Sequence, residues 1–200
     1  MIVSQFGVES WMDQYEEGAK YNITDTCAKP LSLAELLALA GEDRTDFMDR
    51  FFEREQTYGT IFGSEKVKKE ISRLYTSIRP EEILTEHGAT GGNQHIFFSL
   101  IRPGDRVIAF SPSYQQFYSA PEALGAEVTV LRLRRENGYL PDLDELSQAA
   151  ARGVRMICLN NPNNPTGTLI PSDMMKDIVT IARQSGAYLF CDEVYSGVSI

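Results

Sequence analysis

The stretches Asn-Asn-Pro-Asn-Asn-Pro-Thr-Gly at residues 160–167 and Cys-Asp-Glu-Val-Tyr at residues 191–195 decide the fold of this chain. Each follows a short apolar run of the kind that forms a buried strand, at residues 156–159 and 187–190. Residues 171–185, which lie between the two strands, predict one helix. Because a strand, a helix and a second strand in this order form a parallel pair, the two polar stretches meet at one edge of a sheet.

The polar side chains that meet at this edge include Asn164, Asp192 and Tyr195. Open α/β sheets bind small ligands at the carboxyl ends of their strands. An amide, a carboxylate and a phenol that converge there suit a flat, polar heteroaromatic ligand, because they offer hydrogen-bond donors and acceptors around a ring. The sequence therefore predicts a cofactor site at this edge.

The alternation of strands and helices extends toward the N-terminus as far as residue 82. The predicted strands are residues 83–86, 107–110, 127–133, 155–160 and 187–190, and the predicted helices among them are 93–101, 114–124, 142–150 and 171–185. Strands of four to seven mostly apolar residues that alternate with helices predict an α/β fold. We expect a mainly parallel sheet of five strands with helices on both faces.

The chain before this region has a weaker pattern. Residues 1–32 are polar with scattered aromatic side chains, and they are expected to be irregular. Short helices are predicted at residues 33–39 and 46–54, and a further helix is predicted to start after Ser64.

The composition is that of a globular protein without a basic face. Of the 200 residues, 42% are hydrophobic and 24% are charged, and the formal net charge is -9. This acidic balance disfavours nucleic acid and anionic membranes, because both attract basic surfaces. The sequence contains neither the ~20 consecutive apolar residues that cross a bilayer nor the basic start of a signal peptide. We expect a cytoplasmic protein with no nucleic-acid or membrane partner.

The three cysteines, Cys27, Cys158 and Cys191, form an odd set with no regular spacing. Cys158 and Cys191 lie inside predicted strands, where a thiol is usually a small buried apolar group. This usage fits a reducing compartment. No Cys-x-x-Cys, His-Glu-x-x-His or comparable cluster indicates a metal site, and the two histidines, His87 and His95, are interpreted as structural.

Together, the asparagine-proline stretch and the Asp-Glu-x-Tyr stretch resemble the class I/II aminotransferases. These are pyridoxal phosphate (PLP) enzymes of fold type I, the fold of aspartate aminotransferase. The resemblance runs from about Tyr58 to residue 200. It implies an N-terminal arm and part of a small domain over residues 1–45, and a PLP-binding large domain over residues 46–200 that is incomplete at its C-terminus. The lysine that carries the cofactor in this family is expected beyond residue 200, in a longer protein.

The resemblance gives roles to the residues at the sheet edge. The aspartate matching Asp192 pairs with the protonated pyridine nitrogen of PLP, and the amide matching Asn164 donates to the phenolic oxygen of the cofactor. Tyr195 matches a tyrosine that contacts the same oxygen, and Asp192 and Tyr195 are the expected catalytic residues. Without the resemblance, Asp192 could be a helix cap or part of a structural ion pair, Asn164 a turn residue, and Tyr195 a packing residue.

The segment Gly-Ala-Thr-Gly-Gly-Asn at residues 88–93 follows a predicted strand and opens a helix. Glycines permit a tight turn, and the free N–H groups at a helix start bind anions. The resemblance implies that this turn holds the cofactor phosphate through positions matching Gly92 and Asn93. A nicotinamide-binding fingerprint is the alternative, but it needs an acidic residue about 20 residues further on. The next strand ends instead in Phe-Ser-Pro at residues 110–112.

Two tyrosines complete the predicted site. Tyr114 follows the strand at residues 107–110, where the family places an aromatic side chain stacked on the pyridine ring; a residue that covers the core edge is the alternative. Tyr58 begins the segment Tyr-Gly-Thr-Ile-Phe-Gly, which resembles a family segment whose tyrosine binds the phosphate in the partner subunit. This implies a homodimer with shared active sites, and a surface turn is the alternative for Tyr58.

The function implied by the resemblance is a PLP-dependent aminotransferase that moves an amino group between an amino acid and a 2-oxo acid. A C–S lyase or a cyclopropane-forming lyase of the same fold would have the same cofactor site. If the chain were complete, it would lack the cofactor-binding lysine and would be a non-catalytic fragment.

Overall fold

The structure is a computed structural model that describes residues 2–24 and 26–198. The chain forms two compact units. The first, which we call the sheet unit, contains the residues up to 24 and those from 87 onward; the second, the helical unit, spans Asp25–Glu86. The sequence suggested a division into residues 1–45 and 46–200, and this division stays a prediction. Its boundary near residue 45 lies inside the helical unit.

Within the described residues, the sheet unit contains one parallel sheet of four strands in the order β2-β1-β3-β4. The strands are β1 (Arg106–Ser111), β2 (Glu127–Arg132), β3 (Met156–Asn160) and β4 (Tyr188–Asp192). In the register of β3 and β4, Asn160 lies directly beside Asp192. The α/β fold and the parallel sheet predicted from the sequence are confirmed.

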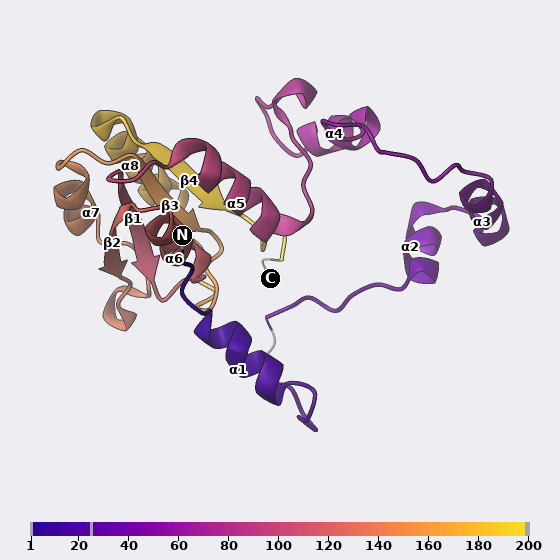
Figure 1. The fold of residues 1–200 in the computed structure, drawn as a ribbon, viewed down its shortest axis with the longest axis horizontal. Helices are drawn as coiled ribbons and strands as arrows, with labels where there is room; N and C mark the ends of the chain where they lie inside the picture. The colour runs from indigo at the N-terminus through magenta and orange to yellow at the C-terminus, as the bar shows by residue number, and fades with distance from the viewer. Residues whose placement is uncertain (1, 25, 199–200) are drawn as a thin grey trace. The chain divides into compact units, whose positions relative to one another are not determined.

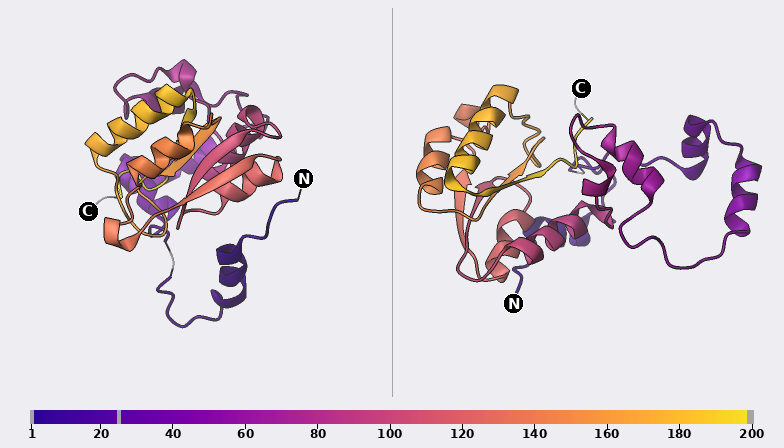
Figure 2. Two further views of the ribbon diagram at one scale, coloured as in Figure 1. Left: turned by 90° about the vertical axis from the view of Figure 1, so that its left-hand side faces the viewer. Right: turned by 90° about the horizontal axis from the view of Figure 1, so that it is seen from above.

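Helices cover both faces of this sheet (Figures 1 and 2). They are α5 (Gly88–Leu100), α6 (Gln116–Ala123), α7 (Leu143–Ala150) and α8 (Ser172–Ser185), with a short 3-10 turn, η2 (Arg135–Asn137), after β2. The side chains of β1 alternate between the two layers: Val107 and Ala109 belong to the core under α5 and α6, and Ile108 and Phe110 belong to the core under α7 and α8. Burial on both faces explains why the central strands β1 and β3 have continuous apolar sequences.

The order of the strands determines where a ligand can bind. From β1 the chain passes through α6 to β2 on one side, and from β2 it returns through α7 to β3 on the other side of β1. In open α/β sheets, such a reversal of direction opens a crevice at the carboxyl ends of the two strands involved. Here those strands are β1 and β3.

The prediction of a strand at residues 83–86 is wrong. These residues follow the 3-10 turn η1 (Pro80–Glu82), form no strand, and belong to the helical unit. An extended segment becomes a strand only when a neighbouring strand supplies hydrogen bonds. None of the strands in the described part of the chain pairs with this segment.

The prediction of irregular structure over residues 1–32 is also wrong in part. Helix α1 (Gly7–Tyr15) forms in this region and belongs to the sheet unit. Its apolar residues are Val8, Trp11, Met12 and Tyr15, which follow the i, i+3, i+4, i+7 spacing of a helix. The signal for the helix was therefore present in the sequence.

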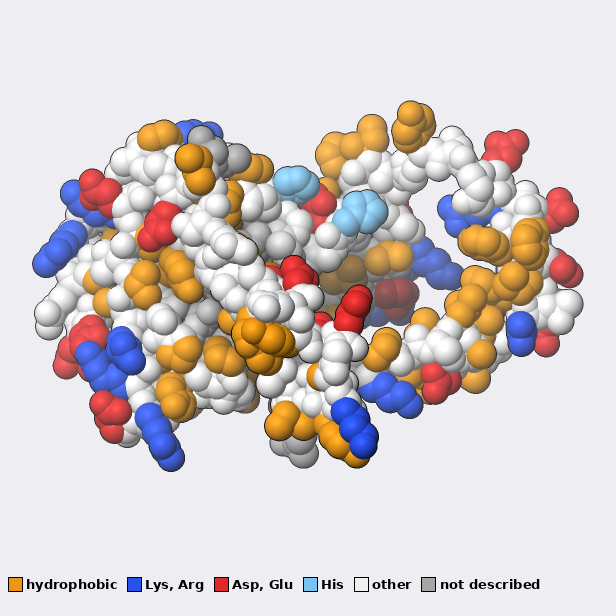
Figure 3. All heavy atoms as spheres, turned by 60° about the horizontal axis from the view of Figure 1, so that its bottom comes forward, with side chains coloured by type: hydrophobic (Ala, Val, Ile, Leu, Met, Phe, Trp, Pro, Cys, Tyr) orange, Lys and Arg blue, Asp and Glu red, His pale blue; other side chains and the backbone are white. Residues whose placement is uncertain are grey.

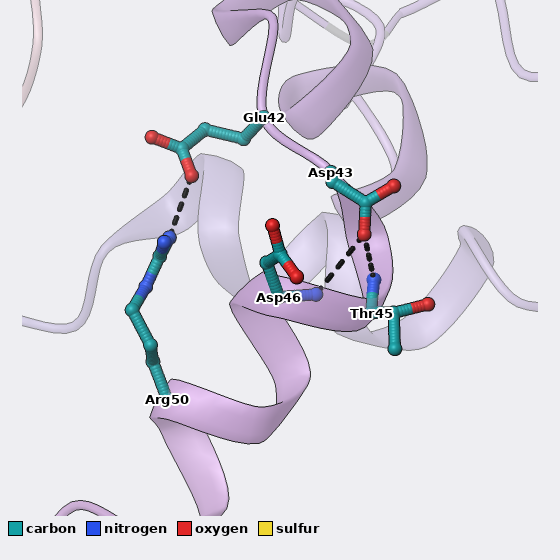
Figure 4. Close-up of polar contacts among 5 residues, drawn as sticks. All are labelled: Glu42, Asp43, Thr45, Asp46 and Arg50. Carbon is teal, nitrogen blue, oxygen red and sulfur yellow. Dashed lines mark hydrogen bonds and ion pairs between the residues drawn. The ribbon is translucent and has the colours of Figure 1, made fainter.

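The helical unit contains α2 (Leu33–Ala40), α3 (Arg44–Phe52) and α4 (Glu65–Ser72), close to the predicted positions. Helix α3 is capped by Asp43, whose carboxylate accepts hydrogen bonds from the N–H groups of Thr45 at 2.8 Å and Asp46 at 3.0 Å (Figure 4). Arg50 forms an ion pair with Glu42 at 2.6 Å. Local capping explains why such short helices were visible in the sequence.

On the surface, acidic and basic side chains are interspersed with apolar ones, as the face in Figure 3 shows. None of the helices in the described ranges, 2–24 and 26–198, has the length and apolar character needed to cross a bilayer.

Candidate functional site

Asp192 ends β4 and has only 7% of its surface exposed. Its Oδ1 accepts hydrogen bonds from the backbone N–H of Val194 at 3.0 Å and from the Nδ2 of Asn160 at 3.4 Å. Its Oδ2 accepts a hydrogen bond from the Nδ2 of Asn93 at 2.7 Å. A buried carboxylate needs such donors, because its desolvation is otherwise costly.

The side chain of Asn93 lies between Asp192 and helix α6. Besides its bond to Asp192, its Nδ2 donates to the Oε1 of Gln116 at 3.1 Å. The Nε2 of Gln116 donates in turn to the backbone carbonyl of Thr90 at 2.9 Å. The two amides therefore connect the carboxylate at the end of β4 to the first turn of α5.

Tyr114 lies next to the same turn. Its hydroxyl is 3.4 Å from the Oγ1 of Thr90, and its ring meets the rings of Phe6 and Phe117 edge-on. Burial raises the pKa of the Tyr114 hydroxyl above its ordinary value of 10.0, and the nearby carboxylates of Glu9 and Asp192 raise this pKa further. Tyr114 is thus a neutral phenol under physiological conditions.

Asn164 and Tyr195 form a pair on the other side of Asp192. The Nδ2 of Asn164 donates to the hydroxyl of Tyr195 at 3.1 Å. The backbone N–H of Asn164 donates to the Oδ1 of Asn160 at 2.6 Å, which ties the loop after β3 to the end of that strand. Asn160 also donates to the backbone carbonyl of Asp192 at 3.1 Å.

These bonds join into one chain across the carboxyl edge of the sheet. Its members, in spatial order, are Tyr195, Asn164, Asn160, Asp192, Asn93, Gln116, Thr90 and Tyr114. The structure therefore brings together the sequence-predicted residues Asn93, Tyr114, Asn164, Asp192 and Tyr195. Sequence reasoning missed Thr90, Gln116 and Asn160 as members, although Asn160 opens the deciding motif.

The glycine segment lies differently from the predicted turn. Helix α5 begins at Gly88, so the glycines form its first turns instead of preceding it. Gly88 itself has a positive φ of 77°. Four N–H groups have no partner inside the helix, those of Gly88, Ala89, Thr90 and Gly91, and the N–H groups of Gly92 and Asn93 lie within the helical ladder. His87, which caps the helix, makes no side-chain bond to the free groups.

The start of the chain is held against this edge by Gln115. Its Oε1 accepts from the backbone N–H of Gly7 at 3.0 Å, and its Nε2 donates to the backbone carbonyl of Gln5 at 2.9 Å. These bonds seat Phe6 against Tyr114. A hollow of about 300 Å³ lies farther along this arm, between Trp11 and Thr24, and it contains no member of the hydrogen-bonded chain.

The role expected of Tyr58 stays a prediction. Tyr58 belongs to the helical unit and is 99% exposed. Burial raises the pKa of the Cys191 thiol to about 12, and burial likewise raises the pKa of Cys158 well above its usual range, so neither thiol is a nucleophile near neutral pH. Among the described residues, no group of His, Cys, Asp and Glu side chains is arranged to hold a metal ion.

The raised pKa of Tyr114 predicts a loss of stability in alkali. The folded state holds the phenolic proton more tightly than the unfolded state, so this contribution is present below pH 10 and disappears as the pH rises through the higher folded pKa. We expect the urea midpoint to fall less between pH 9 and pH 11.5 in a Tyr114→Phe variant than in the wild type, by the linkage relation. Parallel curves for the two proteins would contradict the prediction.

One family model and several known proteins match this chain. The model of the family described as aminotransferase class I and II matches residues 45–200. A crystal structure of a PLP-dependent aminotransferase from Streptococcus suis is similar to this chain with a TM-score of 0.93 and 44% identity, and the match covers 97% of this chain and 52% of that one.

Curated relatives match over shorter regions. An aspartate aminotransferase of Sulfurisphaera tokodaii is 30% identical over 140 residues, which are 69% of this chain and 35% of that protein. An LL-diaminopimelate aminotransferase of Syntrophobacter fumaroxidans is 34% identical over 115 residues, which are 58% of this chain and 30% of that protein. The matched regions span about a third of the length of these relatives.

Proposed function

Because this chain belongs to the class I and II aminotransferase family, we propose that it supplies the PLP-binding part of an aminotransferase that moves an amino group between an amino acid and a 2-oxo acid. The observation that carries this proposal is the hydrogen-bonded chain at the carboxyl edge of the sheet, with Asp192 at its centre. The names of the relatives favour an aminotransferase over a C–S or cyclopropane-forming lyase.

The residues of the chain fit the cofactor by their chemistry. An ionised carboxylate has about four lone-pair positions, and three of those of Asp192 are taken by protein donors. One acceptor position therefore remains on Oδ2 for the N–H of a protonated pyridine ring. Asn164 and Tyr195 offer an amide and a phenol beside it, which suit the phenolic oxygen of the same ring.

Each residue then has a defined task in the proposed reaction. When bound, PLP supplies an electron-accepting ring that stabilises negative charge at the α-carbon of the substrate. Asp192 keeps the ring nitrogen protonated, because its charge favours a cation beside it. Asn164 and Tyr195 would orient the ring through its phenolic oxygen, and Tyr114 would cover a ring face. Asp192 and Tyr195 remain the proposed catalytic residues.

The phosphate of the cofactor needs an anion site at the start of α5. The resemblance assigns this role to Gly92 and Asn93, whose N–H groups lie inside the helix. The free N–H groups of residues 88–91 are better donors, since they also lie at the positive end of the helix dipole. We therefore propose that the phosphate binds one turn earlier than the sequence suggested.

The wider arrangement follows from the family and extends the same proposal. We place the cofactor-binding lysine after residue 200, and we propose a cytoplasmic homodimer in which Tyr58 reaches the phosphate bound to the partner subunit. The full exposure of the Tyr58 side chain supports this role, because it leaves the phenol available to another molecule.

Titration with PLP of the purified full-length protein, produced with the lysine-bearing region proposed after residue 200, tests the proposal. We expect saturable binding with one PLP per chain by calorimetry, and transfer of an amino group when an amino acid and a 2-oxo acid are both supplied. NAD is the control ligand, and it should not bind. The absence of saturable PLP binding would contradict the proposal, and release of sulfide or ammonia without amino transfer would favour a lyase.

A further inference from the structure

Two buried amides, Asn93 and Gln116, separate Asp192 from the body of α6. Asn93 is 6% exposed and Gln116 is 2% exposed, and Asp192 itself is 7% exposed. Neither amide has a part in the proposed contacts with PLP described so far. Their polar atoms nevertheless face one another and the carboxylate at 2.7 Å and 3.1 Å.

The bonds fix the orientation of both amides. The NH₂ group of Asn93 has two hydrogens, and one goes to Asp192 and the other to Gln116. A flipped Asn93 would turn its carbonyl oxygen toward the carboxylate, and two acceptors would then face each other. The Gln116 amide is fixed in the same way, because its NH₂ group donates to the carbonyl of Thr90 and its oxygen accepts from Asn93.

These bonds leave Asp192 one free acceptor position, and they fix the direction in which it points. The backbone of Val194 and the side chain of Asn160 occupy Oδ1, and Asn93 occupies one lone pair of Oδ2. The remaining acceptor position is therefore on Oδ2, at an angle set by Asn93. Rotation of the carboxylate would break the shortest of these bonds.

Packing alone does not require this arrangement. A buried polar or ionic group can often be replaced by apolar side chains of similar size with no loss of stability. A carboxylate whose donor amide, Asn93, is itself held in orientation by a second amide, Gln116, has in contrast one oxygen held in place. The same series of bonds ends at Thr90, in the turn with the free N–H groups of α5.

We propose that Asn93 and Gln116 are positioning residues that aim Oδ2 of Asp192 at the pyridine nitrogen of the cofactor. They also link this carboxylate to the turn of α5 that would receive the phosphate, so both ends of the cofactor share one hydrogen-bonded frame. This inference rests on the proposed function. It gives Asn93 a role different from the phosphate contact that the resemblance implied.

The test compares PLP with its analogue in which a C–H group replaces the ring nitrogen. Binding of both ligands to the purified protein is measured by calorimetry for the wild type and for the Asn93→Leu, Gln116→Leu and Ser119→Ala variants. Ser119 is the matched control, because it is 2% exposed on the same helix as Gln116 and bonds Gln115 instead of this network. Circular dichroism establishes that each variant is folded.

The wild type should prefer PLP over the analogue, since only PLP can donate to Asp192. In Asn93→Leu this preference should fall about tenfold or more, the factor expected for one hydrogen bond to a charged group. Gln116→Leu should lower the preference by a smaller factor, and Ser119→Ala should leave it unchanged. A general loss of packing would weaken both ligands equally and would not change their ratio.

The outcomes separate the two proposals. If the wild type binds PLP and the preference is unchanged in both Asn93→Leu and Gln116→Leu, the positioning role is wrong and the proposed function stands. If the wild type binds neither ligand, the proposed function fails and the positioning role fails with it. If Asn93→Leu does not fold, Gln116→Leu decides, because it leaves the bond between Asn93 and Asp192 in place and removes only its support.

Discussion

Replacement of Asp192 by asparagine is expected to lower the rate of amino transfer by about a hundredfold to several thousandfold. The variant keeps the shape of the side chain and loses its charge, so a cationic ring nitrogen would lie in a buried site without its counterion. Loss of one partner from a buried ion pair costs about 3–5 kcal/mol, which corresponds to this range of rates. Three protein donors that now serve a carboxylate would also face a weaker acceptor.

The measurement is the single-turnover rate with an amino acid at saturating PLP. Glu193→Gln is the matched control, because it removes a carboxylate from the next residue, which is exposed. We expect Glu193→Gln to retain the wild-type rate within a few-fold. Equal rates in Asp192→Asn and the wild type would show that this carboxylate does not serve the ring nitrogen.

Replacement of Phe97 by alanine is expected to lower the free energy of unfolding by about 3–5 kcal/mol, the range measured for large aromatic residues in cores. Phe97 is fully buried, and its ring lies 5.3 Å from that of Phe190 in the core between α5 and the sheet. A cavity at this position would remove contacts on which both α5 and β4 depend. Those two elements carry Asn93 and Asp192.

Phe98→Ala provides the control, since Phe98 follows on the same helix and is 45% exposed. Surface substitutions of this kind usually change stability by about 0.5 kcal/mol or less. Urea unfolding of the purified protein measures both variants. Similar losses for Phe97→Ala and Phe98→Ala would mean that α5 does not pack on the sheet as described.

The sequence was most informative where a signal is local. The strand ending at Asn160 and the strand ending at Asp192 were visible because each is an apolar run followed by polar residues. The structure shows that these two residues are also paired in the register of the two strands. Helix α8 was equally clear in the sequence, because a glycine, Gly186, stands just past its end. In the structure Gly186 ends the helix in a left-handed conformation with a φ of 68°.

Predictions from the sequence were wrong where contacts with segments distant along the chain decide the secondary structure. Residues 83–86 have the composition of a strand, but strand formation needs hydrogen bonds from another segment. The glycines at residues 88–92 suggested a turn, yet α5 starts at Gly88 because its later residues pack on the sheet. Tertiary packing overrides the low helix propensity of glycine in this helix.

By itself, the sequence determined the parallel α/β sheet and the convergence of Asn164, Asp192 and Tyr195 at its edge, because strand periodicity and chain direction are properties of short segments. Only the tertiary structure decided how Asp192 is held. Asn93 is 99 residues away from Asp192 along the chain and 23 residues from Gln116, so no local pattern could reveal their bonds. Those contacts exist because α5 and α6 pack on the same face of the sheet, which brings Asn93 to the carboxylate of Asp192 and Gln116 to Asn93.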